Sequence, residues 1–113
     1  MTVIILEDDL AVCDAISLFV SQLGHAVRSF SDAESFFASI VPAPEDMVIV
    51  DIGLPGMDGS QVISWLNALA SPPRVLAITG QSQTSIRDFL TESPSTMLMR
   101  KPLSPQELSS FFQ

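Results

Sequence analysis

Five short apolar runs are spaced along the chain, and longer segments with a helical pattern lie between them. The runs occupy residues 2–6, 26–30, 47–51, 74–79 and 96–99, and several are apolar throughout. Short runs that contain β-branched residues and little polar alternation are typical of strands covered on both faces. The pattern therefore predicts five strands, several of them buried.

The segments between the runs place apolar residues on one side of a helix. The stripe of the first segment ends at Gly24, a natural helix stop, and consists of Val12, Ile16, Phe19, Val20 and Leu23. The third segment repeats this spacing at Val62, Ile63, Leu66 and Leu69. The segment near 82–91 has a narrower apolar side, made of Ile86, Phe89 and Leu90. These stripes predict helices between the strands.

Two helix starts carry a capping signal. Ser31 with Glu34 and Ser104 with Glu107 both match the S-x-x-E capping box. Pro105 occupies the first helical position of the last segment, where its missing N–H costs nothing. We therefore expect the second and fifth helices to begin directly after Ser31 and Ser104.

Strands that alternate with helices through short loops require right-handed crossovers and a parallel sheet. We predict an α/β fold, namely a (βα)5 doubly wound five-stranded parallel sheet with helices on both faces. The chain has 113 residues, of which 47% are hydrophobic. This size suits one core, so we expect a single domain over residues 1–113.

Charge and composition exclude several classes of partner. Thirteen acidic side chains face five basic ones, for a formal charge of -8, and such a surface repels nucleic-acid phosphates. The uninterrupted apolar runs fall far short of the roughly 20 residues of a membrane-spanning helix, and three acids from Glu7 onward argue against a signal peptide. The lone Cys13 is expected to be a buried thiol in a reducing cytosol. We therefore expect a cytoplasmic domain that binds neither nucleic acid directly nor a membrane.

Polar residues gather where the predicted strands end, which is the edge at which such sheets carry their chemistry. Four of the five strands contribute, through Glu7, Asp8, Asp9, Asp51, Thr79, Gly80 and Lys101. Carboxylates that lie close raise each other's pKa unless a cation neutralises them. Mg²⁺ prefers such oxygen ligands. Zinc is disfavoured, because none of these strand-end residues is a His or a Cys. His25 precedes the second strand, at the opposite edge, and is expected to be an exposed loop residue.

Together these groups supply the parts of a phosphoryl-transfer site. A carboxylate beside Mg²⁺ is a nucleophile in aspartyl-phosphate chemistry. A metal and a lysine neutralise phosphoryl oxygens, while a threonine hydroxyl and a backbone N–H donate hydrogen bonds to them. Lys101 is the only lysine in the chain, so a solubilising role explains it poorly.

Each residue also has a purely structural interpretation. Asp9 and Asp58 fit helix N-caps, because aspartate is favoured there. Thr79 alone fits an ordinary β-branched strand residue, and Lys101 alone fits a solvated charge at a strand end. Their joint placement with Asp51 and the acid pair on four strands favours the functional interpretation.

Four stretches, in this order, resemble the receiver domain of two-component response regulators: "VIILEDD", "VIVDIGLPGMDG", "LAITG" and "LMRKP". The resemblance covers residues 2 to about 112. Its central stretch is specific, because the phosphoacceptor, the L-P turn and the D-G helix start occur together. It implies a flavodoxin-like receiver fold and a phosphorylation-dependent switch that catalyses only its own phosphoryl transfer and dephosphorylation, and so is not an enzyme in the usual sense.

The resemblance implies a role for each matching residue. Asp51 is the phosphoacceptor, and the implied Mg²⁺ ligands are Glu7 through water, Asp8 directly, Asp51, and the main-chain carbonyl of Gly53. The implied phosphate-binding residues are Thr79, Gly80 and Lys101. Glu7 and Asp8, rather than Asp9, form the acid pair because Val12 then begins the buried face of the first helix. The family also has a cis peptide at the position of Lys101–Pro102.

Two positions depart from the family pattern. The switch pairs the threonine with an aromatic residue three positions before the lysine, but here Thr79 is matched by Leu98, and the chain has no tyrosine. An aromatic rotamer switch is therefore in doubt. Gly53 places no side chain beside Asp51, so dephosphorylation is expected to depend more on Gln81. Gly56 and Gly59 are expected to relax the turn after Asp51.

Three functions compete on this sequence. In the first, a sensor histidine kinase or phosphotransfer domain phosphorylates Asp51, and the face of the fourth helix, fifth strand and fifth helix changes its affinity for an output domain, a target protein or a second copy. In the second, a degenerate receiver with Leu98 docks without phosphorylation. A phosphohydrolase of the haloacid dehalogenase type is the third, but it requires an acid where Gly53 stands. Any output domain is expected to lie outside this chain.

Overall fold

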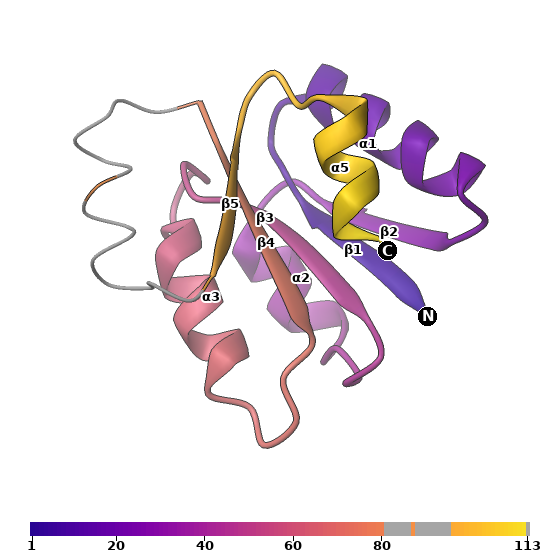
Figure 1. Cartoon of the computed structure of the whole chain (residues 1–113). Coiled ribbons are helices and arrows are strands. Elements are labelled where there is room, and N and C mark those ends of the chain that lie inside the picture. Colours follow the sequence, from indigo (N-terminus) through magenta and orange to yellow (C-terminus); the bar gives the residue numbers. More distant parts are fainter. Residues whose placement is uncertain (81–86, 88–95, 113) are drawn as a thin grey trace.

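Five parallel strands form one sheet in the computed structural model, which describes residues 1–80, 87 and 96–112 (Figure 1). The strands are β1 (Thr2–Leu6), β2 (Ala26–Phe30), β3 (Met47–Asp51), β4 (Arg74–Thr79) and β5 (Met97–Arg100). Their order across the sheet is β2-β1-β3-β4-β5, and every pairing is parallel. The predicted sheet is confirmed, with β5 one residue later than the apolar run indicated.

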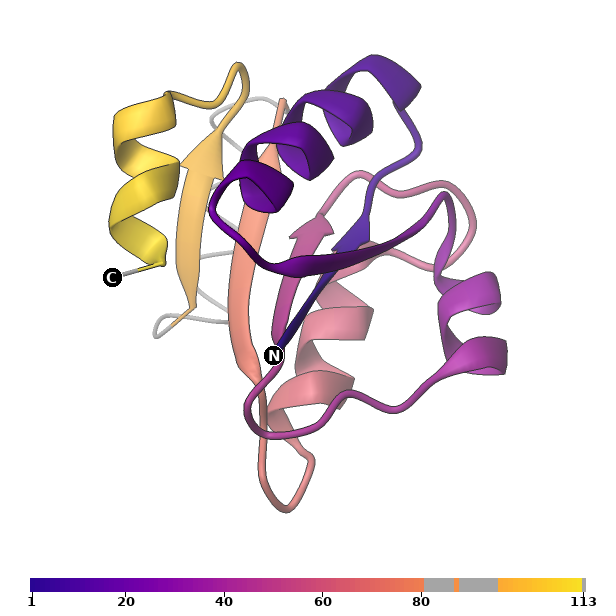
Figure 2. The same cartoon turned by 90° about the vertical axis from the view of Figure 1, so that its right-hand side faces the viewer.

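Helices cover both faces of the sheet. Helices α1 (Leu10–Gln22) and α5 (Pro105–Phe111) lie side by side on one face, while α2 (Ala33–Ser39) and α3 (Gly59–Asn67) cover the other (Figure 2). Only residue 87 of the helix predicted near 82–91 lies within the described residues, so that helix is not tested. None of the helices within the described ranges is long and apolar enough to cross a membrane.

Alternate residues of the strands lie in two separate cores, one on each face of the sheet, as expected for a sheet buried on both faces. One core joins the sheet to α1 and α5, and its buried helix residues are Cys13, Ile16, Val20, Leu108 and Phe111. The other joins the sheet to α2 and α3, and its buried helix residues are Ala33, Phe36, Val62, Ile63 and Leu66. The buried position of Cys13 is confirmed.

The apolar stripe of α1 is rotated relative to the prediction. Cys13 is buried in this core, whereas Val12 and Phe19 are only partly buried and Leu23 is exposed. Leu23 is the C-cap of α1, and Gly24 follows with φ +93° as the predicted stop. Leu23 therefore lies at the exposed end of the helix, outside the buried stripe.

Three of the predicted caps are confirmed and one is wrong. Asp9, Asp58 and Ser104 are the N-caps of α1, α3 and α5. Helix α2 is capped by Asp32 rather than Ser31, because its first turn begins at Ala33 and the Asp32 carboxylate accepts the Ser35 N–H at 2.7 Å. This hydrogen bond lowers the pKa of Asp32.

The amino edge of the sheet is closed by Asp46, which precedes β3. Its two carboxylate oxygens accept the N–H groups of Thr2 and Ala43, each at 2.9 Å, and its carbonyl accepts the N–H of Arg74 at 3.3 Å. Asp46 thereby joins the beginnings of β1, β3 and β4.

The end of α5 is fastened at the same edge. The Arg74 guanidinium donates to the carbonyl of Phe111 and lies 4.5 Å from the centre of its ring. His25 stacks on Phe112 with ring centres 5.3 Å apart. His25 is a loop residue, as expected, but it is half-buried rather than exposed, because Phe112 at the end of α5 packs on it.

Candidate functional site

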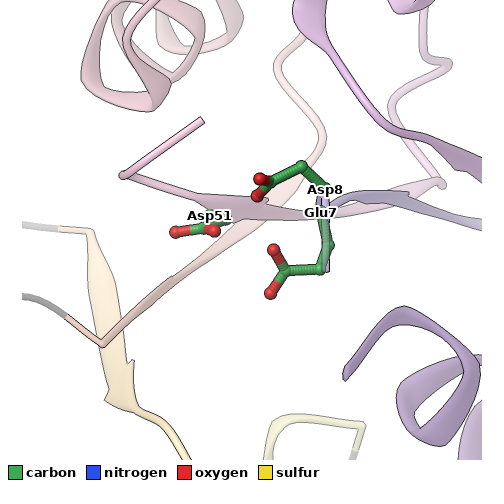
Figure 3. Close-up of side chains that lie close together, drawn as sticks. All are labelled: Glu7, Asp8 and Asp51. Atoms are coloured by element: carbon green, nitrogen blue, oxygen red, sulfur yellow. The ribbon is translucent and has the colours of Figure 1, made fainter. Parts of the chain in front are cut away.

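The predicted site residues lie along the carboxyl edge of the sheet. Asp51 ends β3 and Thr79 ends β4, while Glu7 and Asp8 directly follow β1, the neighbour of β3. The carboxylates of Glu7, Asp8 and Asp51 are directed into a common space (Figure 3). One oxygen from each lies within 4.8 Å of the others. Parallel strands in register thus bring together acids that are 44 residues apart.

Lys101, which directly follows β5, bridges two of these acids. Its Nζ lies 2.5 Å from Oε1 of Glu7 and 3.0 Å from Oδ2 of Asp51. Its main-chain N–H donates to the carbonyl of Thr79 at 2.7 Å. The peptide from Lys101 to Pro102 is cis, as the resemblance implied. The lysine is thus held by its main chain at β4 and by its ammonium at the acids.

The Asp51 carboxylate is held at both oxygens. Oδ1 accepts the N–H of Gly53 at 2.9 Å, and Oδ2 accepts from Lys101. Asp51 is 5% exposed, whereas Gly53 lies at the surface. Because Gly53 has no side chain, its amide orients the carboxylate without adding bulk beside it.

Glu7 is the most deeply buried of the three clustered acids. It is 1% exposed, and Oε2 accepts the N–H of Asp9 at 3.3 Å. Burial, together with the neighbouring Asp51, raises the pKa of Glu7 to about 7, although Lys101 pulls it down. Oε1 is paired with the ammonium of Lys101. One ammonium therefore serves two buried acids, Glu7 and Asp51.

Lys101 stays charged in this setting. Burial of its ammonium would lower its pKa, but hydrogen bonds to Glu7 and Asp51 outweigh that effect and raise it. The lysine is thus a permanent cation in the physiological range, available to an anion that displaces one of the acids.

The donor set fits Mg²⁺. It consists of carboxylate oxygens from three residues, two of them buried, and the single ammonium of Lys101 faces Glu7 and Asp51. Asp8 is exposed, so its side of the cluster is open to water. Mg²⁺ takes one or two carboxylates and keeps several waters, which this half-open arrangement allows.

The Asp9 carboxylate caps a helix and does not belong to the acid cluster. Its Oδ1 accepts the N–H groups of Ala11 and Val12, at 3.0 and 3.3 Å, as the N-cap of α1. This use of the carboxylate agrees with a pair formed by Glu7 and Asp8.

Thr79 and Gly80 flank Lys101. Thr79 is fully buried, and a Cβ placed on Gly80 would lie 3.8 Å from Cδ of Lys101. Both residues are therefore gathered at the same edge as the acids.

One predicted residue within the described ranges is not gathered there. Leu98 pairs with Ala77, two residues before the end of β4, and packs against the core under α2 and α3. Gln81 lies outside the described residues. Leu98 is thus a partly buried residue of β5 that packs against this core, and it is not part of the acid cluster.

Gly59 contacts the site in a way the sequence interpretation missed. It was expected to relax the turn, but it is buried at the first position of α3, against the main chain of Asp51. The signal was a glycine at a helix start, where other residues give more stable helices. Gly56 does match the expectation, because its φ is +75°.

Known proteins share this fold. A family model, the response regulator receiver domain, matches residues 3–113. The chain belongs to the response regulator receiver family. Receiver domains are signalling domains of two-component systems that accept a phosphoryl group and generally bind Mg²⁺ at an acidic pocket. This receiver domain has an acidic cluster, made of Glu7, Asp8 and Asp51.

Individual relatives are distant in sequence. The transcriptional regulatory protein FixJ of Bradyrhizobium diazoefficiens is 23% identical over 109 residues, which is 96% of this chain and 53% of FixJ. The transcriptional regulatory protein QseB of Haemophilus influenzae is 26% identical over 113 residues, which is 100% of this chain and 51% of QseB. This receiver domain thus spans about half the length of these curated relatives.

Solved structures share the fold. A putative response regulator from Chloroflexus aurantiacus has a TM-score of 0.84 and 26% identity, covering 98% of this chain and 93% of that chain. A CheY-like receiver domain protein from Methanospirillum hungatei has a TM-score of 0.83 and 22% identity, covering 98% of this chain and 89% of that chain. The five-stranded receiver fold is therefore established for this chain.

Proposed function

We propose that this receiver domain accepts a phosphoryl group on Asp51 from a partner histidine kinase or phosphotransfer domain, in the cytoplasm. The observation that carries the proposal is that both oxygens of Asp51 are already held, by Gly53 and Lys101, in a cluster with two further acids. A nucleophile held in this way loses little freedom on the path to the transition state.

Each residue has a part in the proposed transfer. A carboxylate oxygen of Asp51 attacks the phosphorus, an acyl phosphate forms, and the bond from phosphorus to the donor nitrogen breaks. Lys101 exchanges its contact with Asp51 for one with a phosphoryl oxygen. The Thr79 hydroxyl and the Gly80 N–H donate to the remaining oxygens. In dephosphorylation, water attacks the same phosphorus. Gly53 has no side chain that could orient this water, so we assign that role to Gln81.

Glu7, Asp8, Asp51 and the Gly53 carbonyl would hold Mg²⁺. A bound Mg²⁺ supplies positive charge that neutralises the phosphoryl oxygens. The carboxylates themselves orient the acceptor and keep Glu7 ionised once the cation offsets their mutual repulsion.

The proposed output is a change in binding at the surface of β5, α5 and the segment near 82–91. Partners that bind the two states unequally shift their populations, and equal binding would shift nothing. An output domain, a separate target protein or a second copy are the partner classes that fit this role.

Substitution of Asp51 tests the proposal. With acetyl phosphate and Mg²⁺, the wild-type chain should gain 80 Da by intact mass spectrometry, and the added phosphate should be lost in hydroxylamine. Asp51→Asn should show no addition, while Asp46→Asn, at the opposite edge, should label normally if folded. Full labelling of the Asp51→Asn chain would contradict the assignment.

A docking module that works without phosphorylation is the second candidate. Leu98 favours it, because an aliphatic side chain, partly buried against the core, stands at the position where the family carries its aromatic switch residue. Mg²⁺ with beryllofluoride separates the two candidates. A rise in melting temperature that disappears in Asp51→Asn supports the switch, and no rise at millimolar Mg²⁺ supports docking.

A further inference from the structure

The first turn of α3 lies directly against the main chain of the phosphoacceptor. Helix α3 begins at Gly59, which is buried. A Cβ built on Gly59 would lie 2.2 Å from the carbonyl oxygen of Asp51 and 2.5 Å from Cα of Ile52. Both distances are far below any normal contact, and the atoms involved belong to the backbone. No side chain fits at this position without a shift of the helix or of β3.

Backbone conformation does not explain this glycine. Gly24 and Gly56 have φ values of +93° and +75°, which favour glycine, but Gly59 does not have a positive φ. Glycine also weakens a helix relative to alanine. The residue is therefore explained by the close approach, and not by a turn that only glycine can form.

Neither partner in this contact can move freely. The start of α3 is fixed by a capping box, in which Asp58 accepts the Ser60 N–H at 3.1 Å and Gln61 accepts the Asp58 N–H at 3.2 Å. On the other side, Ile52 donates to the carbonyl of Ile78 at 3.0 Å. The peptide between Asp51 and Ile52 is thus enclosed between α3 and β4.

We infer that Gly59 is a positioning residue for phosphoryl transfer, because the absence of its side chain lets α3 hold the Asp51 main chain in the place where Gly53 and Lys101 orient the carboxylate. Gly59 touches no reacting atom. It acts through Asp51, and the inference rests on the proposed role of Asp51 as phosphoacceptor.

Gly59→Ala tests the inference. Misplacement of a reacting group by about 1 Å can cost about 100-fold in rate, so we expect the rate of acetyl phosphate labelling to fall at least 10-fold. The Gly53 amide, which donates to Asp51, should shift in ¹H–¹⁵N spectra recorded without Mg²⁺. A role in stability alone would move neither quantity once the folded fraction is matched.

Val62→Ala is the control, because it weakens α3 from within the core and leaves Gly59 in place. It should lower the melting temperature while keeping the labelling rate and the Gly53 amide position of the wild type. If Gly59→Ala is unfolded at the labelling temperature, both signals are measured for it, the wild type and Val62→Ala at a temperature below its melting temperature.

The outcomes separate this inference from the proposed function. Wild-type labelling that is lost in Asp51→Asn establishes the acceptor. In that case, a Gly59→Ala chain that labels at the wild-type rate, with an unmoved Gly53 amide, overturns the positioning role alone. If Asp51→Asn labels fully, the acceptor assignment fails first, and the positioning role fails with it.

Discussion

The two edges of the sheet use acidic side chains in opposite ways. At the amino edge, both carboxylate oxygens of Asp46 accept main-chain N–H groups, from Thr2 and Ala43. At the carboxyl edge, three acids share one space, and the ammonium of Lys101 contacts two of them, Glu7 and Asp51. The amino edge thus uses its charge to stabilise the fold, whereas the carboxyl edge keeps charge available to a cation and a phosphoryl group.

This difference agrees with a general tendency of functional sites. Perturbed carboxyl groups cluster where chemistry occurs, at some cost in stability. The raised pKa of Glu7 belongs to the carboxyl edge. Substitutions that affect one edge and leave the other intact test this difference between the two edges.

Removal of the lysine should have the largest effect. Lys101→Met deletes the ammonium that contacts Glu7 and Asp51. Removal of one such electrostatic donor typically costs about 10²–10³ in rate, so labelling by acetyl phosphate should fall by about 100-fold or more. Mg²⁺ binding, followed by isothermal titration calorimetry, should persist, since the acids remain. Wild-type labelling in Lys101→Met would remove the lysine from the site.

Asp46→Ala should act on stability alone. It leaves the N–H groups of Thr2 and Ala43 without their partner, and each lost partner of a part-buried donor costs about 1 kcal/mol. We expect the free energy of unfolding in urea to fall by about 2 kcal/mol. The labelling rate of the folded chain should stay within about twofold of wild type. A large loss of rate at full folding would show that the two edges are coupled.

Glu7→Gln should stabilise the metal-free chain at high pH. The pKa of Glu7 lies at about 7 in the folded state, above its unfolded value near 4.5, so folding takes up a proton between these values. The stability this group contributes is present below pH 4.5 and is lost as pH rises through 7.

In EDTA at pH 8, the free energy of unfolding of Glu7→Gln should therefore exceed that of wild type by about 3 kcal/mol, because the pKa of Glu7 rises from 4.5 to about 7 on folding and one pKa unit is worth about 1.4 kcal/mol. At pH 4.5 the two chains should be equal in urea titrations. In 10 mM Mg²⁺ the order at pH 8 should reverse, since the glutamine is a poorer ligand. A constant difference across pH would show that Glu7 does not titrate in this range.

Much of the fold was predictable because its signals are local. The strands, the stop at Gly24 and the caps at Asp9 and Asp58 all rest on neighbours within four residues. The errors were also local in kind. The α2 cap moved from Ser31 to Asp32 by one residue, and both side chains can cap a helix, so the choice depends on where packing starts the first turn.

The site was predictable only as a set of residue types at one sheet edge. Topology put Glu7, Asp8, Asp51 and Lys101 at the ends of strands, and the parallel sheet then made them neighbours. The pairing of Lys101 with Glu7 as well as Asp51, and the contact of Phe112 with His25, depend on side-chain directions across the fold. No spacing in the sequence contains that information.

The sequence by itself determined the alternation of strands and helices, the acids at the strand ends and the likeness to receiver domains, because these depend on residue type and short-range order. Only the tertiary structure decided which oxygen of Asp51 faces Lys101, why the pKa of Glu7 rises, and that α3 touches the Asp51 main chain at Gly59. Burial, charge coupling and close backbone approach all depend on distances between segments that are far apart in the sequence, and these distances are set only when the chain packs.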